Sequence, residues 1–89
     1  MIKIKMIKDM IRKDVPIYYR NLYTGVAVIE VAANSVDCRI DFAIETKPTG
    51  QKEISVTVLD TIDYPLVPTI NLIKEFITEL DSNGALPAL

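Results

Sequence analysis

The sequence contains no histidine and a single cysteine, Cys38. Without histidine the chain cannot assemble a His/Cys zinc site, nor a Ser-His or Cys-His catalytic pair. It also lacks the side chain that most often exchanges protons near neutral pH. We therefore expect a protein that is not an enzyme, and we assign no catalytic, cofactor-binding or metal-binding residue.

Long apolar runs are absent as well. The longest runs, residues 26–29 and 31–33, are far shorter than the roughly 20 residues of a membrane-spanning helix. Lysines interrupt the first eight residues, so no apolar region of a secretion signal forms there. A single cysteine cannot form an internal disulfide, which agrees with a reducing compartment. We expect a cytoplasmic protein with no membrane segment.

Glycine is scarce, and the three glycines stand far apart at Gly25, Gly50 and Gly84. Phosphate-binding loops need glycines clustered at short spacing. The sequence therefore predicts no nucleotide-binding loop and no cofactor.

What the chain does contain is enough apolar residue for one core. Of its 89 residues, 49% are hydrophobic and 25% are charged, unlike a disordered chain. At this length we expect a single small α+β domain over residues 1–89. Its expected parts are a basic N-terminal segment (1–22), a β-meander (23–60), a proline-containing loop (61–67), a helix (68–82) and a tail (83–89).

Charge is distributed unevenly along the chain. Residues 1–20 hold six basic and two acidic residues, a net +4, whereas residues 21–89 hold four basic and ten acidic residues, a net −6. Two interpretations are open: the basic segment docks on the acidic remainder, or it forms a surface for an acidic partner. We favour the first.

The clearest predicted element is the helix at residues 68–82. Ile70, Ile73, Ile77 and Leu80 recur at spacings of three and four, which is typical of one buried helical face. Proline is tolerated in a first helical turn, and Asn83-Gly84 is suited to ending a helix.

Alternating apolar and polar residues predict strands at 36–45 and 53–58, joined as a hairpin by the Pro- and Gly-containing residues 47–51. Residues 24–33 are rich in β-branched residues and predict a central strand. The expected fold class is α+β. It is an antiparallel three- to four-stranded β-meander with a C-terminal helix packed on one face and an N-terminal strand or short helix at the edge.

A two-residue turn at Asn34-Ser35 would set the register of the first hairpin. It places apolar residues opposite one another on one face and a charge pair on the other. The predicted pairs are Val31–Cys38, Ile29–Ile40, Ala27–Phe42 and Glu30–Arg39.

The first third of the chain carries two patterns. Residues 2–6 alternate like an edge strand, whereas Ile4, Ile7 and Met10 are spaced like a helix. We predict a strand at about residues 2–6 followed by a helical turn through 7–13. Residues 15–19 would add a further edge strand, where Pro16 is allowed.

Three of the four tyrosines lie at residues 18–23, beside an arginine. Such side chains make interface hot spots, stack on nucleic-acid bases, or simply close over the edge of a core. On the outer face of the sheet, valines of the central strand join Ala43 and Leu59 in an apolar strip that needs a cover. The N-terminal segment could supply it, and a second subunit or a partner protein is the alternative. The candidate partner-binding residues are Tyr18, Tyr19, Arg20, Tyr23, Val26 and Val28.

These features favour a non-enzymatic module for protein–protein interaction or self-association, with a protein partner or a second copy as ligand. The alternative is a nucleic-acid-binding module that uses the basic segment and the tyrosine-rich loop. Its basic residues would be Lys3, Lys5, Lys8, Arg12, Lys13 and Arg20. An enzyme that uses Asp60 and Asp63 is the weakest hypothesis, because two carboxylates near a helix start more often cap turns.

Overall fold

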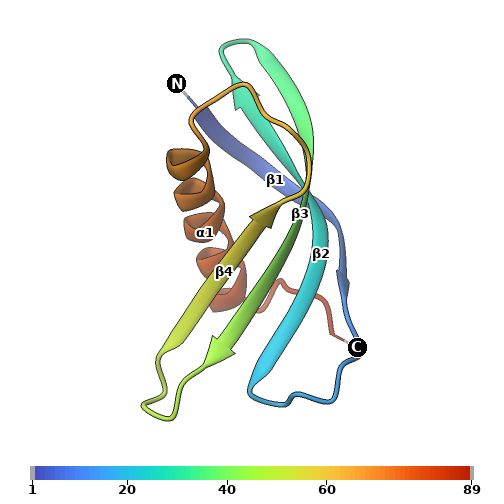
Figure 1. The fold of residues 1–89 in the computed structure, drawn as a ribbon, viewed down its shortest axis with the longest axis vertical. Helices are drawn as coiled ribbons and strands as arrows, with labels where there is room; N and C mark the ends of the chain where they lie inside the picture. The colour runs from blue at the N-terminus through green and yellow to red at the C-terminus, as the bar shows by residue number, and fades with distance from the viewer. Residues whose placement is uncertain (1, 89) are drawn as a thin grey trace.

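The structure is a computed structural model that describes residues 2–88, and in this part of the chain four strands form one sheet beside one helix (Figure 1). The elements are β1 (Ile2–Arg12), β2 (Arg20–Val31), β3 (Asn34–Thr46), β4 (Lys52–Val58) and α1 (Leu66–Ser82). The strands follow one another in the order β1-β2-β3-β4, and every pair is antiparallel. The predicted α+β meander with a C-terminal helix is confirmed, and the N-terminal element at its edge is a strand.

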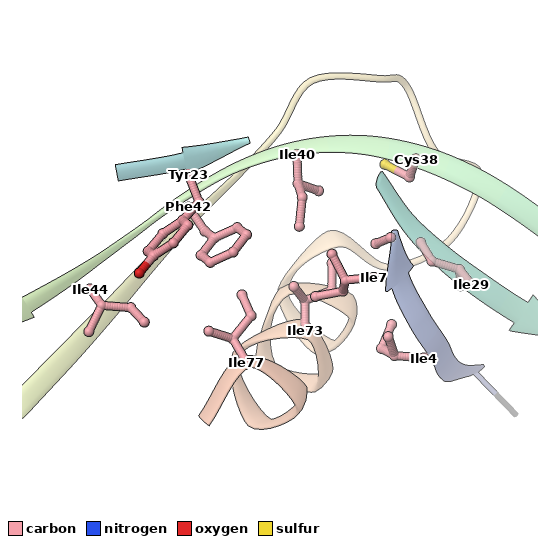
Figure 2. Packing of buried hydrophobic residues seen from close by; sticks show 11 residues of the cluster. Ile4, Ile7, Tyr23, Ile29, Cys38, Ile40, Phe42, Ile44, Ile73 and Ile77 are labelled. Carbon is pink, nitrogen blue, oxygen red and sulfur yellow. The ribbon is translucent and has the colours of Figure 1, made fainter. Parts of the chain in front are cut away.

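The core lies between the inner face of the sheet and α1 (Figure 2). Ile29 and Ile40 from the sheet and Ile73 and Ile77 from the helix are all fully buried. The alternation along each strand and the spacing of three and four along the helix bring these residues to the same layer.

The register of the β2–β3 hairpin differs from the prediction. The loop is Ala32-Ala33, so Val31 pairs with Asn34 and Ala27 with Cys38. Each residue therefore meets a partner four positions from the expected one. Because the shift is even, the buried faces of both strands are the ones expected, and apolar alternation cannot distinguish the two registers. Asn34 and Ser35 are favoured turn residues, whereas Ala32 adopts a left-handed φ of 55° that its side chain disfavours.

The predicted helical turn at residues 7–13 is wrong, because these residues continue strand β1 to Arg12. The register against β2 shifts by one residue between Ile4 and Met6, and again between Lys8 and Ile11. Each shift is a β-bulge, which adds one residue to the period of two. Ile4, Ile7 and Met10 consequently reach the inner face at spacings of three. The helix-like spacing is that of a twice-bulged strand.

Gly25 permits the second bulge. A Cβ atom at this position would lie 3.1 Å from Ile7 Cγ2 and 3.3 Å from Met10 Cγ. Asp9 adopts a φ of 53° opposite this point. Glycine in mid-strand here reflects close approach by the neighbouring strand.

The predicted edge strand at residues 15–19 is also wrong: the segment is a loop. The edge of β2 that it would need is already occupied by β1. Helix α1 begins at Leu66, two residues before the expected Pro68. The carbonyl of Pro65 accepts both the backbone N–H of Thr69, at 3.3 Å, and its hydroxyl, at 2.8 Å.

Replacing a helix residue at the centre of this core should cost substantial stability. Ile73→Ala removes a fully buried side chain and leaves a cavity, so we expect the free energy of unfolding to fall by about 2 to 5 kcal/mol. The control, Tyr18→Ala, changes a side chain that is 97% exposed and should alter it by less than about 0.5 kcal/mol. Urea titration followed by circular dichroism measures both. Equal effects would contradict the assigned core.

Candidate protein-binding surfaces

The structure separates the six residues predicted to bind a partner. Tyr18 and Tyr19, 97% and 53% exposed, lie in the loop between β1 and β2, and Arg20 begins β2. Tyr23 is only 4% exposed, because its ring stacks on Phe42 in the core with centroids 4.8 Å apart (Figure 2). The two valines lie farther along β2. Only the first three therefore form one surface.

Tyr18 and Tyr19 meet edge to face, with ring centroids 6.0 Å apart and planes at 88°. They border a hollow of about 410 Å³ between the β1–β2 loop and the start of the β3–β4 hairpin. The hollow is lined by Tyr18, Tyr19, Glu45, Thr46, Lys47 and Pro48.

Backbone hydrogen bonds anchor the loop that carries these tyrosines. The N–H of Thr46 in β3 donates to the carbonyl of Tyr19 at 2.8 Å, and the N–H of Lys13 donates to the carbonyl of Leu22 at 2.8 Å. Both ends of the loop are thus fastened to the sheet, while the tyrosine rings project from it. The loop presents its aromatic side chains in a fixed place.

Arg20 adds an unsatisfied donor to this end of the sheet. Its Nε is buried and has no hydrogen-bond partner among residues 2–88. A buried N–H without an acceptor is unfavourable, by about 1 to 3 kcal/mol. Arg20 also borders a smaller hollow on the outer face, together with Lys13 and Asp41.

The outer face is closed by charge, and the prediction that the N-terminal segment covers it is wrong. That segment is β1 and lies beside β2 in the sheet. From β1, Lys8 reaches across β2 to Asp37 of β3, with Nζ 2.8 Å from the carboxylate. The hydrogen bond to Asp37 raises the pKa of Lys8. Val28, paired with Asp37 in register, is only 7% exposed.

A second charge pair closes the end of β3. Arg39 Nη2 lies 2.7 Å from Asp60 Oδ1, and the backbone N–H of Arg39 donates to Oδ2 at 2.8 Å. The side-chain hydrogen bond from Arg39, followed by this backbone bond, lowers the pKa of Asp60. Arg39 therefore pairs with Asp60, and the predicted pairing with Glu30 does not occur, because Glu30 lies opposite Ser35 in the register.

Cys38 is fully buried on the inner face, as its position in the strand pattern predicted. Burial raises the pKa of its thiol. A thiol that stays protonated and inaccessible is a weak nucleophile. The residue packs as a small apolar side chain.

The largest hollow lies between β1 and α1, with a volume of about 570 Å³. Strand and helix line it with apolar side chains, and two glutamates border it on the helix side. Its lining is Ile2, Lys3, Ile4, Leu72, Glu75, Phe76, Thr78 and Glu79. Sequence reasoning missed this groove, although Leu72 and Phe76, which flank the buried helical stripe, were its signal.

The model of one uncharacterised protein family matches residues 1–82, from the start of the chain to the last residue of α1. The chain belongs to this family. The family carries a locus-style designation in place of a functional name, so membership relates the chain to other sequences and assigns it no activity. For this family member, comparisons with curated proteins and with solved structures gave no significant match.

The family match spans all five elements and therefore every surface described above. Within residues 2–88 of this family member, α1 is too short and too polar to cross a membrane.

The Arg39–Asp60 pair predicts a pH dependence of stability for this family member. The folded-state pKa of Asp60 lies below its ordinary value of 3.8, so its contribution is present above pH about 4 and is lost as pH falls through the folded-state pKa. Asp60→Asn should destabilise the protein at neutral pH, and its difference from the wild type should shrink under acid conditions. Urea titrations across this range measure it.

The matched control is Asp63→Asn, which changes an exposed carboxylate nearby that forms no ion pair within residues 2–88. It should leave the pH profile unchanged. A deficit of Asp60→Asn that stays constant from neutral to acid pH would show that the ion pair does not stabilise the fold.

Proposed function

We propose that this chain is a non-enzymatic domain that binds another protein through the surface around Tyr18, Tyr19 and Arg20. The observation that carries the proposal is the pair of exposed tyrosines beside a hollow, on a loop fastened at both ends. Tyrosine and arginine are the residue types enriched at the energetic centres of protein interfaces.

The geometry favours binding because little has to be ordered when a partner arrives. A tyrosine has two rotatable side-chain bonds, and each aromatic side chain can bury about 150 to 250 Å². The hydrogen bond between Thr46 and Tyr19 already fixes the backbone. A preorganised aromatic pair avoids part of the entropy cost of association.

Neighbouring polar groups would give such an interface direction. Glu45 and Lys47 border the hollow with opposite charges, and Arg20 offers its unsatisfied Nε–H. A partner with an acceptor at this point would remove the penalty of the buried donor. The proposed partner is a protein surface that is apolar at its centre and hydrogen-bonding at its rim.

The nucleic-acid hypothesis has weaker support from the same structure. Lys8 is paired with Asp37, and Arg12 donates to Asn21 Oδ1 at 2.8 Å. Both basic groups are thus already engaged within the chain. A phosphate-binding groove needs a continuous row of available cations alongside a stacking platform.

Substituting the tyrosine pair tests the proposal. Immobilised wild-type chain and the double variant Tyr18→Ala/Tyr19→Ala are incubated with extract from the native host, and retained proteins are quantified by mass spectrometry. A candidate partner is then purified and its Kd measured. We expect the double variant to raise Kd at least about 30-fold, because each hot-spot residue contributes about 1 kcal/mol or more.

The matched control is Leu66→Ala/Val67→Ala, which removes two adjacent exposed apolar side chains at the start of α1. It should leave Kd unchanged. A partner that binds both double variants like the wild type would exclude the tyrosine surface. Binding of single-stranded RNA that weakens steeply with salt would instead support the alternative.

A further inference from the structure

The sheet has two edges, and the edge at β1 is protected against further strand pairing. Strand β1 carries Lys3, Lys5 and Lys8, and its register is broken by two bulges. Lysines and bulges on an edge strand are the devices by which proteins prevent an added strand from pairing.

The edge at β4 carries neither device along most of its length. The register of β4 against β3 runs without a shift from Lys52 to Val58. Its last five residues, Ile54–Val58, contain no charge and no proline. The inward-facing Ile54, Val56 and Val58 remain half-buried against the core, and the outward-facing Ser55 and Thr57 are exposed. Half of the backbone groups of such an edge strand point away from the sheet.

We propose that β4 pairs antiparallel with β4 of a second copy of the chain, about a two-fold axis, and joins two four-stranded sheets into one of eight strands. This goes beyond the proposed function because it uses a different surface from the tyrosine loop and names its occupant. Like-to-like contact about a two-fold axis is the commonest form of oligomer interface.

The sequence of β4 is complementary to itself in this arrangement. With Val56 on the axis, Ile54 lies opposite Val58 of the partner subunit, and Ser55 lies opposite Thr57 of the partner subunit. The inner face then carries only apolar cross-strand pairs, and the outer face carries hydroxyl pairs, both of which are favourable. The partly exposed apolar side chains at this edge would become buried.

Charge explains why a second copy fits β4 and not β1. A β1–β1 contact would bring the lysines of one copy close to those of the other, and like charges across strands repel. In the β4 contact, the charged residues at the start of the strand reach the opposite end of the partner. There Lys52 lies opposite Asp60 of the partner subunit, which has the opposite charge.

Helix α1 is compatible with the joined sheet. It packs on the inner face, and Lys52 Nζ lies 2.7 Å from Asp81 Oδ2, which fastens the start of β4 to the end of the helix (Figure 1). A two-fold axis perpendicular to the sheet would place both helices on the same face. The outer face would then remain continuous and polar across the contact.

Charge substitution on the outer face of β4 tests the proposal without touching the core. The full-length chain is measured by sedimentation velocity and light scattering from low micromolar to submillimolar concentration. We expect the wild type to form a dimer, and Ser55→Lys/Thr57→Lys to raise the dimer dissociation constant about 100-fold or more through like-charge repulsion. Ser55→Glu/Thr57→Glu should dissociate equally.

Mixing the two variants provides the decisive result, because opposite charges then face each other and a heterodimer should form. The control Asn34→Lys/Ser35→Lys changes exposed residues of β3 and should leave the dimer intact. The variant Tyr18→Ala/Tyr19→Ala should also remain dimeric, so failure of the tyrosine surface would not affect this result. A wild type that stays monomeric throughout, a lysine variant that still dimerises, or variants that do not associate when mixed would each overturn the β4 contact.

Discussion

The packing of one helix against one face of the sheet is the contact on which the rest of this structure depends. Ile73 and Ile77 of α1 meet Ile29 and Ile40 of the sheet, and all four are fully buried. A single helix about 10 Å wide cannot cover a sheet of four strands spaced about 4.8 Å apart. The inner face is therefore open at both sides, as the groove beside β1 and the half-buried side chains of β4.

The outer face follows a different principle, since charged side chains cover it. The reach of Lys8 across β2 to Asp37, and the grip of Asp60 on Arg39, cover or border the apolar residues of β2. These pairs are exposed to solvent, so each adds little stability by itself. Their larger effect is to make the face polar, which leaves the tyrosine loop and the β4 edge as the surfaces suited to a partner.

Much of the fold could be predicted from residue patterns, and so could one part of the candidate site. The alternation in β3 and β4 and the spacing in α1 identified the inner-facing side chains, including Ile40 and Ile77. The exposed pair Tyr18 and Tyr19 was identified from composition alone. Tyr23 belonged to the same cluster of residue types, yet it is two positions into the inward alternation of β2 from Asn21 and stacks on Phe42 in the core. A local cluster of aromatic residues does not reveal which face of a strand each residue occupies.

The sequence by itself determined which side chains are buried, because burial follows the period of each element, and that period is local. Only the tertiary structure decided the register of Ala32-Ala33, the bulges of β1 and the route of Lys8 to Asp37. Registers that differ by two or four residues bury the same faces, and a bulged strand imitates the spacing of a helix. Their choice depends on contacts between segments distant in the sequence, as does the difference between a protected edge at β1 and an open one at β4.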